Sequence, residues 1–261
     1  MTERLIESLS KATSARLEIQ GGALRTHSTR SSLIKYKEHF YRYFFDYVLI
    51  YHAINDLWMN NVALENFKAD YSHYDPWNKR NAVLNHSLIA RYIYNRFLWN
   101  APKYLENGSQ FSSYQTFEQN IRELILIKED NGVPILMTFA WYIPDDYTRE
   151  KFNQGRLGYN NPTNYDRIAV ECWGSVDYVR EGLIRHNSII RKIASEEQVM
   201  LIDIEGMDTF RNNQQNFGDV AHFSEDGTEI FIKLITDFFL SQDLLPMSGS
   251  TREDANAAVK P

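Results

Sequence analysis

The sequence predicts an α/β protein built on a parallel β-sheet. Residues 46–51, 133–139 and 199–204 are short runs of aliphatic and aromatic residues, the composition of strands buried on both faces. Segments with apolar side chains at helical spacing separate these runs, and strands that alternate with helices form parallel sheets covered by helices. Residues 16–20 alternate apolar and polar residues before two glycines, so we expect a further strand there, ahead of the other three.

Helices are expected wherever apolar side chains recur every three or four positions between the strands. The predicted helical segments are 2–11, 31–43, 114–129, 175–193 and 224–240. Three of them start with serine, whose hydroxyl can accept hydrogen bonds from the backbone N–H groups of a helix N-terminus. These caps are Ser31 or Ser32, Ser175 and Ser224. A polar loop is expected from 141 to 169.

We expect a single domain over residues 1–240, because no linker interrupts the 261-residue chain. Residues 58–112 form an excursion rich in aromatic residues that is long for a connection between strands. We interpret it as a mostly helical lobe packed over an edge of the sheet, with residues 86–99 as its clearest helix. A lid, an acyl pocket or a membrane-contacting face is the alternative. The tail from 241 to 261 is expected to be flexible.

Composition argues against several classes of function. Lys and Arg total 28 against 34 Asp and Glu, so the formal net charge is −6 and we expect no nucleic-acid partner. The single cysteine, Cys172, cannot form a disulfide within the chain, and no Cys/His cluster indicates a structural metal. We expect neither a transmembrane segment nor an export signal in the chain as given, and its compartment stays open.

The most informative polar residues follow the predicted strands. Ligands of parallel α/β sheets bind beyond the carboxyl ends of the strands, so these positions are candidates for a site. They are Gly22, His52, Asn55, Asp56, Trp141, Tyr142, Asp219 and His222. Trp141 and Tyr142 are candidates for substrate contact, with a packing role as the alternative. Asp56 is interpreted as a helix cap, and His52 as a core histidine that can also reach the pocket.

Asp219 and His222 form a DxxH sequence immediately before the last predicted helix. A carboxylate three residues before an imidazole can accept a hydrogen bond from Nδ1–H, fix the tautomer and prepare Nε2 to act as a general base. Asn55 carries an amide that can donate to an oxyanion, and Gly22 offers a backbone N–H that no side chain covers. The alternatives are a surface turn for the DxxH sequence and a turn or helix cap for Asn55.

Taken together, these blocks resemble the SGNH, or GDSL-like, hydrolase superfamily. The similarity rests on Gly22 after a strand, Asn55 in the sequence YHAIND, and the DxxH sequence, and it covers residues 3–240. The resemblance implies a three-layer α/β/α parallel sheet, the flavodoxin-like SGNH hydrolase fold. It also implies a serine esterase, lipase or carbohydrate deacetylase without a metal or other cofactor, acting on a small-molecule, carbohydrate or lipid ester. In such an enzyme Gly22 and Asn55 line the oxyanion hole, His222 is the base and Asp219 orients it.

The chain departs from the family pattern in three places. Ala53 replaces the glycine of GxND, and Arg25 replaces a second small residue that often follows the glycine to which Gly22 corresponds. The third departure is larger, because no GDS block is present to supply the nucleophilic serine and one oxyanion N–H. In the family this block lies on the central first strand, so the four predicted strands correspond to the second to fifth. We therefore expect a truncated chain that lacks that strand.

The nucleophile is therefore unknown. Several serines lie in the N-terminal part of the chain, but none follows a strand in a tight glycine turn. They are Ser10, Ser14, Ser28, Ser31 and Ser32. Cys172 is a further alternative, and its simpler interpretation is a small buried filler.

Three functions remain open at this point. The first is an SGNH-type serine ester hydrolase, inactive as the chain stands because the nucleophile block is absent. The second is a non-catalytic binding or accessory module that keeps the pocket. The third is a flavodoxin-like binder of a small ligand that shares only the architecture. Membrane contact and the oligomeric state are undetermined by the sequence.

Overall fold

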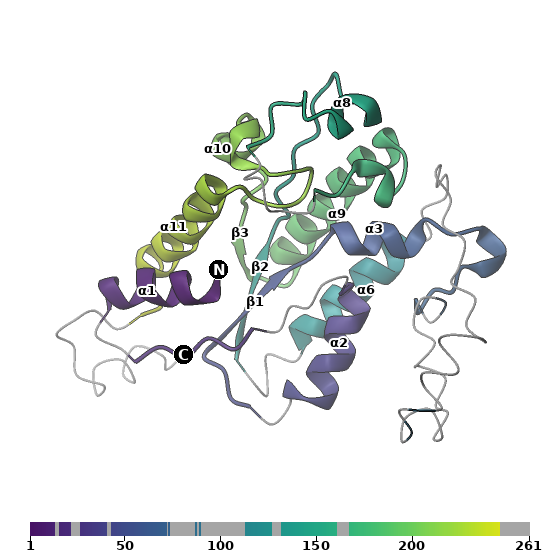
Figure 1. Cartoon of the computed structure of the whole chain (residues 1–261). Coiled ribbons are helices and arrows are strands. Elements are labelled where there is room, and N and C mark those ends of the chain that lie inside the picture. The colour runs from purple at the N-terminus through teal and green to yellow at the C-terminus, as the bar shows by residue number, and fades with distance from the viewer. Residues whose placement is uncertain are drawn as a thin grey trace.

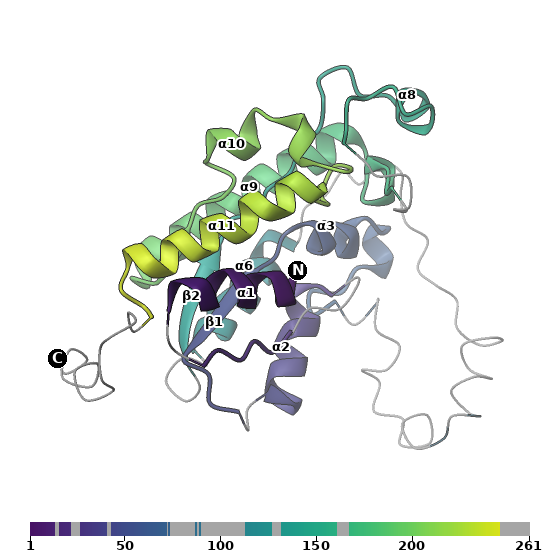
Figure 2. The same cartoon turned by 60° about the vertical axis from the view of Figure 1, so that its left-hand side comes forward.

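A computed structural model gives the architecture of the chain (Figures 1 and 2). The structure describes residues 1–13, 16–21, 27–40, 43–71, 73, 87, 89, 113–126, 132–160 and 167–245. Within these residues three strands, β1 (Tyr47–Tyr51), β2 (Val133–Met137) and β3 (Met200–Ile202), form one parallel sheet in the order β1-β2-β3. The expected α/β class and parallel sheet are thus confirmed.

Eight α-helices and three short 3-10 helices accompany the strands in the described part of the chain. The α-helices are α1 (Thr2–Ala12), α2 (Thr29–Glu38), α3 (Ile54–Asn60), α6 (Ser113–Leu126), α8 (Arg149–Asn153), α9 (Val176–Glu196), α10 (Asp208–Arg211) and α11 (Glu225–Ser241). The 3-10 helices are η2 (Leu64–Asn66), η5 (Val170–Cys172) and η6 (Gln214–Asn216). None of the helices in these described ranges is long and apolar enough to cross a membrane.

Helices cover both faces of the sheet because successive strand residues point to opposite sides. Ile135 and Met137 of β2 pack with residues of α11, and α1 lies alongside α11 on that face (Figure 2). Leu136 of β2 packs on the other face with residues of α2, α6 and α9 (Figure 1). All three of these residues are at most 1% exposed, so the central strand β2 is apolar here because neither of its faces meets water.

A third apolar cluster lies beyond the carboxyl ends of the strands. It joins Ala53 at the start of α3, Phe139 after β2, Leu183 of α9 and Val220 in the loop before α11. Trp141 packs against the same cluster from its edge. The segments that leave β1, β2 and β3 therefore meet at one end of the sheet, where a ligand site was expected.

The strand expected at residues 16–20 is wrong. These residues are described, and they form neither a strand nor a bridge to another described strand. Leu17 and Ile19 instead pack, partly buried, against the cluster on the α11 face. Alternating apolar residues need an apolar surface on one side, and here a helix-covered core supplies it without strand pairing.

Several helix boundaries differ from the expected ones. The N-cap of α2 is Ser28, whose hydroxyl accepts the N–H of Ser31 at 3.4 Å, and the helix ends at Glu38. Ser31 and Ser32 are thus inside the helix and not its cap. The polar loop expected from 141 to 169 contains the helix α8, which the sequence analysis missed.

Other expectations are confirmed or lie outside the described part. Ser175 and Ser224 cap α9 and α11 as predicted, accepting backbone N–H groups at 3.3 and 3.1 Å. In the excursion from 58 to 112 the structure describes α3, η2 and a few residues beyond them, whereas nearly all of the helix expected at 86–99 lies outside the described residues. The tail from 246 onward lies outside them as well.

Candidate active site

Asp219 and His222 form a hydrogen-bonded pair in the loop between η6 and α11. Both carboxylate oxygens of Asp219 lie 2.9 Å from Nδ1 of His222. An ionised carboxylate can only accept a hydrogen bond, so Nδ1 carries the proton and, in the neutral ring, Nε2 carries the lone pair. The imidazole is 45% exposed and the carboxylate side chain 3% exposed. The pair therefore has the geometry of an oriented base that solvent can reach.

Backbone groups hold the Asp219 carboxylate in place. Its Oδ1 accepts the N–H groups of Ala221 and His222, each at 2.9 Å, and its Oδ2 accepts the N–H of Ile168 at 3.0 Å. The loop is closed by a bond from Gly218 N–H to the carbonyl of His222 at 2.8 Å. The acid thus cannot rotate away from the imidazole without breaking several hydrogen bonds.

Trp141 and Tyr142 lie beside this loop, as expected for residues that follow β2. The N–H of Tyr142 donates to the carbonyl of Val220 at 3.1 Å. Val220 lies between Asp219 and His222 in the sequence, so Tyr142 contacts the loop that carries the pair. Trp141 is half-buried, and its indole nitrogen is buried without an acceptor among the described residues. Whether either side chain contacts a substrate stays a prediction.

Asn55 is the second residue of α3, which begins at Ile54, shortly after β1 ends at Tyr51. Its Nδ2 donates to the carbonyl of His27 at 3.0 Å, and an amide nitrogen carries a second hydrogen. Its neighbour Ile54 packs in the same apolar cluster as Val220, so Asn55 and the Asp219–His222 pair lie at the same end of the sheet. The N-cap position of α3 is Ala53, so Asn55 does not cap this helix. Its side chain is instead bound to His27, in the segment before α2. Gly22 and Arg25 lie outside the described residues.

Two histidines lie next to Asn55. Burial, with the neighbouring His27, lowers the pKa of His52 to about 4. Burial also lowers the pKa of His27, with a smaller contribution from Lys35. Both rings are therefore neutral near pH 7. The sequence analysis did not include His27, since nothing in its spacing connects it with Asn55, which lies 28 positions later.

Asp56 joins α3 to α2 through a buried network. Its carboxylate accepts the backbone N–H of Thr29 at 3.1 Å and the hydroxyl of Thr29 at 2.6 Å. Asn120 of α6 donates to the same hydroxyl at 2.9 Å. Burial raises the pKa of Asp56 to about 7. Asp56 is thus a cap, but for the first residue of α2 and not for the helix that contains it.

Cys172 does not have the buried position that the simpler interpretation required. It is a free cysteine in η5 and is exposed as a residue. Neighbouring groups still partly shield its thiol from water, which raises the pKa of the thiol. No described residue therefore stands out as a nucleophile beside His222. In the ranges that the structure describes, no group of three or more His, Cys, Asp or Glu side chains is arranged to hold a metal ion.

The fold and the site define an α/β protein with an Asp–His pair at the carboxyl end of a parallel sheet. Comparisons with models of known protein families and with curated proteins find no match. The function is therefore inferred from the geometry of the site.

Proposed function

We propose that the protein is an ester hydrolase of the SGNH type, whose sheet belongs to a three-layer, flavodoxin-like fold. The single observation that carries the proposal is the 2.9 Å contact between the buried Asp219 and the exposed His222, in the DxxH sequence of that family. The helices on both faces of the sheet and the position of Asn55 at the same end of it support the proposal. The substrate class is a small-molecule, carbohydrate or lipid ester.

The residues have distinct roles in acyl transfer. His222 accepts the proton of the attacking hydroxyl group at Nε2, while Asp219 holds the opposite nitrogen protonated and stabilises the imidazolium that forms. The carbonyl oxygen of the ester becomes an oxyanion, to which Asn55 donates. The family resemblance assigns the same role to the N–H of Gly22, which lies outside the described residues. Collapse of the tetrahedral intermediate breaks the ester bond, and the leaving alcohol takes the proton from His222.

The attacking group in the family is a serine from a GDS block, which the 261 residues do not contain. With the groups present, His222 can activate a water molecule in place of serine. The tetrahedral intermediate then collapses directly to the carboxylic acid and the alcohol, and no acyl-enzyme forms. Enzymes that lose a nucleophile keep part of their rate through the oxyanion donors and binding. The chain is therefore expected to be inactive by the serine route, and to show only slow hydrolysis of an activated ester by attack of water.

Hydrolysis of 4-nitrophenyl acetate by the purified chain tests the proposal. The rate should exceed that of buffer, and His222→Gln should lower it on the order of 10²-fold or to the buffer rate. Because any exposed histidine can cleave this ester slowly, the matched control is His39→Gln, an exposed histidine at the far end of α2 that should leave the rate unchanged. A rate equal to that of buffer, or one that both variants lower equally, would refute the proposal.

A non-catalytic binding module is the second candidate, and the missing GDS block favours it. The two candidates predict different labelling results for the protein translated from the full reading frame of the gene. If a serine-reactive fluorophosphonate labels that protein and His222→Gln abolishes the labelling, the hydrolase is supported. If it is not labelled and no ester is cleaved, the binding module is the better description.

A further inference from the structure

Helix α9 holds the segments that leave all three strands of the sheet. Its residues His186, Asn187 and Arg191 each reach a different segment, and the first two are completely buried. The contacts are made to backbone groups or to carboxylates just beyond the strand ends, where the proposed site begins. One helix therefore provides a common frame for loops that are far apart in the sequence.

His186 holds the joint between β1 and α3. Its Nδ1 lies 3.1 Å from the carbonyl oxygen of Ala53, two residues before Asn55. A carbonyl can only accept, so Nδ1 carries the proton. The ring stacks on Phe117 with centroids 4.0 Å apart, and burial lowers its pKa to about 3, which keeps it neutral. Its Nε2 is buried without a partner among the described residues, so the ring is retained at an energetic cost.

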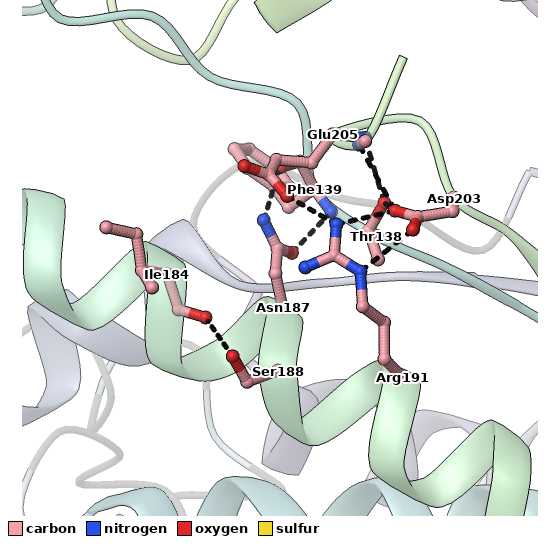
Figure 3. Close-up of polar contacts among 9 residues, drawn as sticks. Thr138, Phe139, Ile184, Asn187, Ser188, Arg191, Asp203 and Glu205 are labelled. Carbon is pink, nitrogen blue, oxygen red and sulfur yellow. Dashed lines mark hydrogen bonds and ion pairs between the residues drawn. The ribbon is translucent and has the colours of Figure 1, made fainter.

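Asn187 holds the end of β2 by two hydrogen bonds. Its Oδ1 accepts the N–H of Phe139 at 2.8 Å, and its Nδ2 donates to the carbonyl of the same residue at 2.9 Å (Figure 3). Three residues later, Tyr142 donates to the carbonyl of Val220, which is followed by Ala221 and His222. A short chain of contacts thus connects Asn187 with the base of the proposed site.

Arg191 holds the segment after β3. Its guanidinium donates to both carboxylate oxygens of Asp203 at 2.8 and 2.7 Å and also contacts Glu205 (Figure 3). Thr138 at the end of β2 donates to Asp203 at 2.9 Å and accepts the N–H of Glu205 at 2.9 Å. This network ties the ends of β2 and β3 together, so α9 holds them as one unit.

We propose that His186 and Asn187 are positioning residues that set the two halves of the site against each other. His186 places the oxyanion donor Asn55, and Asn187 places the base His222 through Phe139 and the contact of Tyr142 with Val220. The catalytic part of this inference rests on the proposed function. The structural part, which concerns where the side chains of Asn55 and His222 lie, can be tested without any activity.

Nuclear magnetic resonance of the whole chain, labelled at Asn and His, provides the first measurement. His186→Phe keeps a ring against Phe117 and removes the donor, so it should shift the side-chain amide resonances of Asn55 and leave those of the His222 ring. Asn187→Leu should shift the His222 ring resonances and leave Asn55. Asn55→Asp and His222→Gln assign the two sets of signals.

Two conservative variants and one control complete the design. His186→Asn keeps an N–H near the position of Nδ1 and should restore the Asn55 resonances. Asn187→Asp keeps the acceptor for Phe139 and is measured if Asn187→Leu does not fold. Ser188→Ala is the control, since this hydroxyl donates only to Ile184 of its own helix at 2.9 Å, away from the strand ends (Figure 3). It should move neither set of signals.

The second measurement is the hydrolysis of 4-nitrophenyl acetate. His186→Phe and Asn187→Leu should each lower the rate on the order of tenfold to a hundredfold, because small displacements of catalytic groups are costly, and Ser188→Ala should not. If both variants move both sets of signals equally, or neither set, the positioning roles are refuted. If the signals move as expected but no hydrolysis depends on His222, the proposed function is refuted and the positioning roles stand.

Discussion

The carboxylate of Asp219 is buried and in contact with the exposed imidazole of His222, with 2.9 Å between each carboxylate oxygen and Nδ1. Burying a carboxylate costs free energy unless its oxygens are hydrogen-bonded, and this one accepts three backbone N–H groups in addition to the imidazole. The fold of the loop therefore depends on the hydrogen bonds that the Asp219 carboxylate accepts.

Asp219→Asn should impair both folding and the proposed reaction. The amide nitrogen would face the N–H of Ile168 or the Nδ1–H of His222, and two donors cannot satisfy each other. We expect a loss of about 1–3 kcal/mol in the free energy of unfolding and a fall in ester hydrolysis on the order of 10²-fold. Urea unfolding and the ester assay measure the two effects.

The matched control for this variant is Asp226→Asn. Asp226 is exposed, and its carboxylate accepts a hydrogen bond from the side chain of Asn160 at 3.2 Å. The control should change stability by less than about 0.5 kcal/mol, as is usual for surface substitutions. Equal effects of the two variants would contradict the central role of Asp219 in the loop.

Gly227 is needed where α11 packs against the segment before Asp219. A Cβ at this position would lie 1.9 Å from the carbonyl oxygen of Asn216. In an ordinary helix Gly→Ala stabilises by about 1 kcal/mol, but here we expect Gly227→Ala to destabilise by about 1–3 kcal/mol because backbone must move. Thermal unfolding measures the sign. Gly21→Ala is the control, since nothing lies within 4 Å of a Cβ there, and a destabilised control would undermine the packing explanation.

Asp56 should make the protein less stable as the pH rises. Burial raises its pKa to about 7 in the folded chain, compared with an ordinary value of 3.8. Between these two values the unfolded chain has lost the proton that the folded chain still holds, so the free energy of unfolding falls with rising pH. Above pH 7 both states are ionised and the loss is complete.

Asp56→Asn removes this titration and keeps an oxygen that can accept from Thr29. The free energy of unfolding of the wild type, relative to that of the variant, should therefore decrease from pH 4 to pH 7 and then level off. Urea unfolding at intervals of half a pH unit measures the difference. A difference that is constant over this range would show that Asp56 is ionised in the folded protein throughout.

Local sequence patterns predicted the parts of the fold and site that depend on near neighbours. The apolar runs at 46–51, 133–139 and 199–204 contain the three strands, and the central one, β2, is buried on both faces, which leaves few other residue types there. The contact between Asp219 and His222 was predictable because three residues of loop suffice to bring the two side chains together. Both patterns are complete within a short stretch of chain.

Patterns that depend on distant partners were not predictable in the same way. Residues 16–20 have strand-like alternation, but whether they pair depends on a neighbouring strand that their own sequence does not specify. Ser28 caps α2. The first residue of that helix, Thr29, is bound by Asp56, which lies 27 residues later in the sequence. His186 and Asn187 appear in the sequence as ordinary helical residues, and only the folded structure shows which backbone groups they hold.

His52 and His186 should destabilise the protein in acid. Burial lowers their pKa values to about 4 and about 3, compared with an ordinary value of 6.5. Between pH 6.5 and these values the unfolded chain takes up protons that the folded chain excludes, so the free energy of unfolding falls as the pH falls. This effect opposes that of Asp56 in the same range, and the single variants are needed to separate them.

His186→Asn should reduce the decline in stability between pH 6.5 and pH 4 in urea unfolding, whereas Ser188→Ala, which removes no titrating group, should leave the slope unchanged. A slope that His186→Asn does not alter would mean that the buried ring takes up its proton in the folded state as readily as in the unfolded chain.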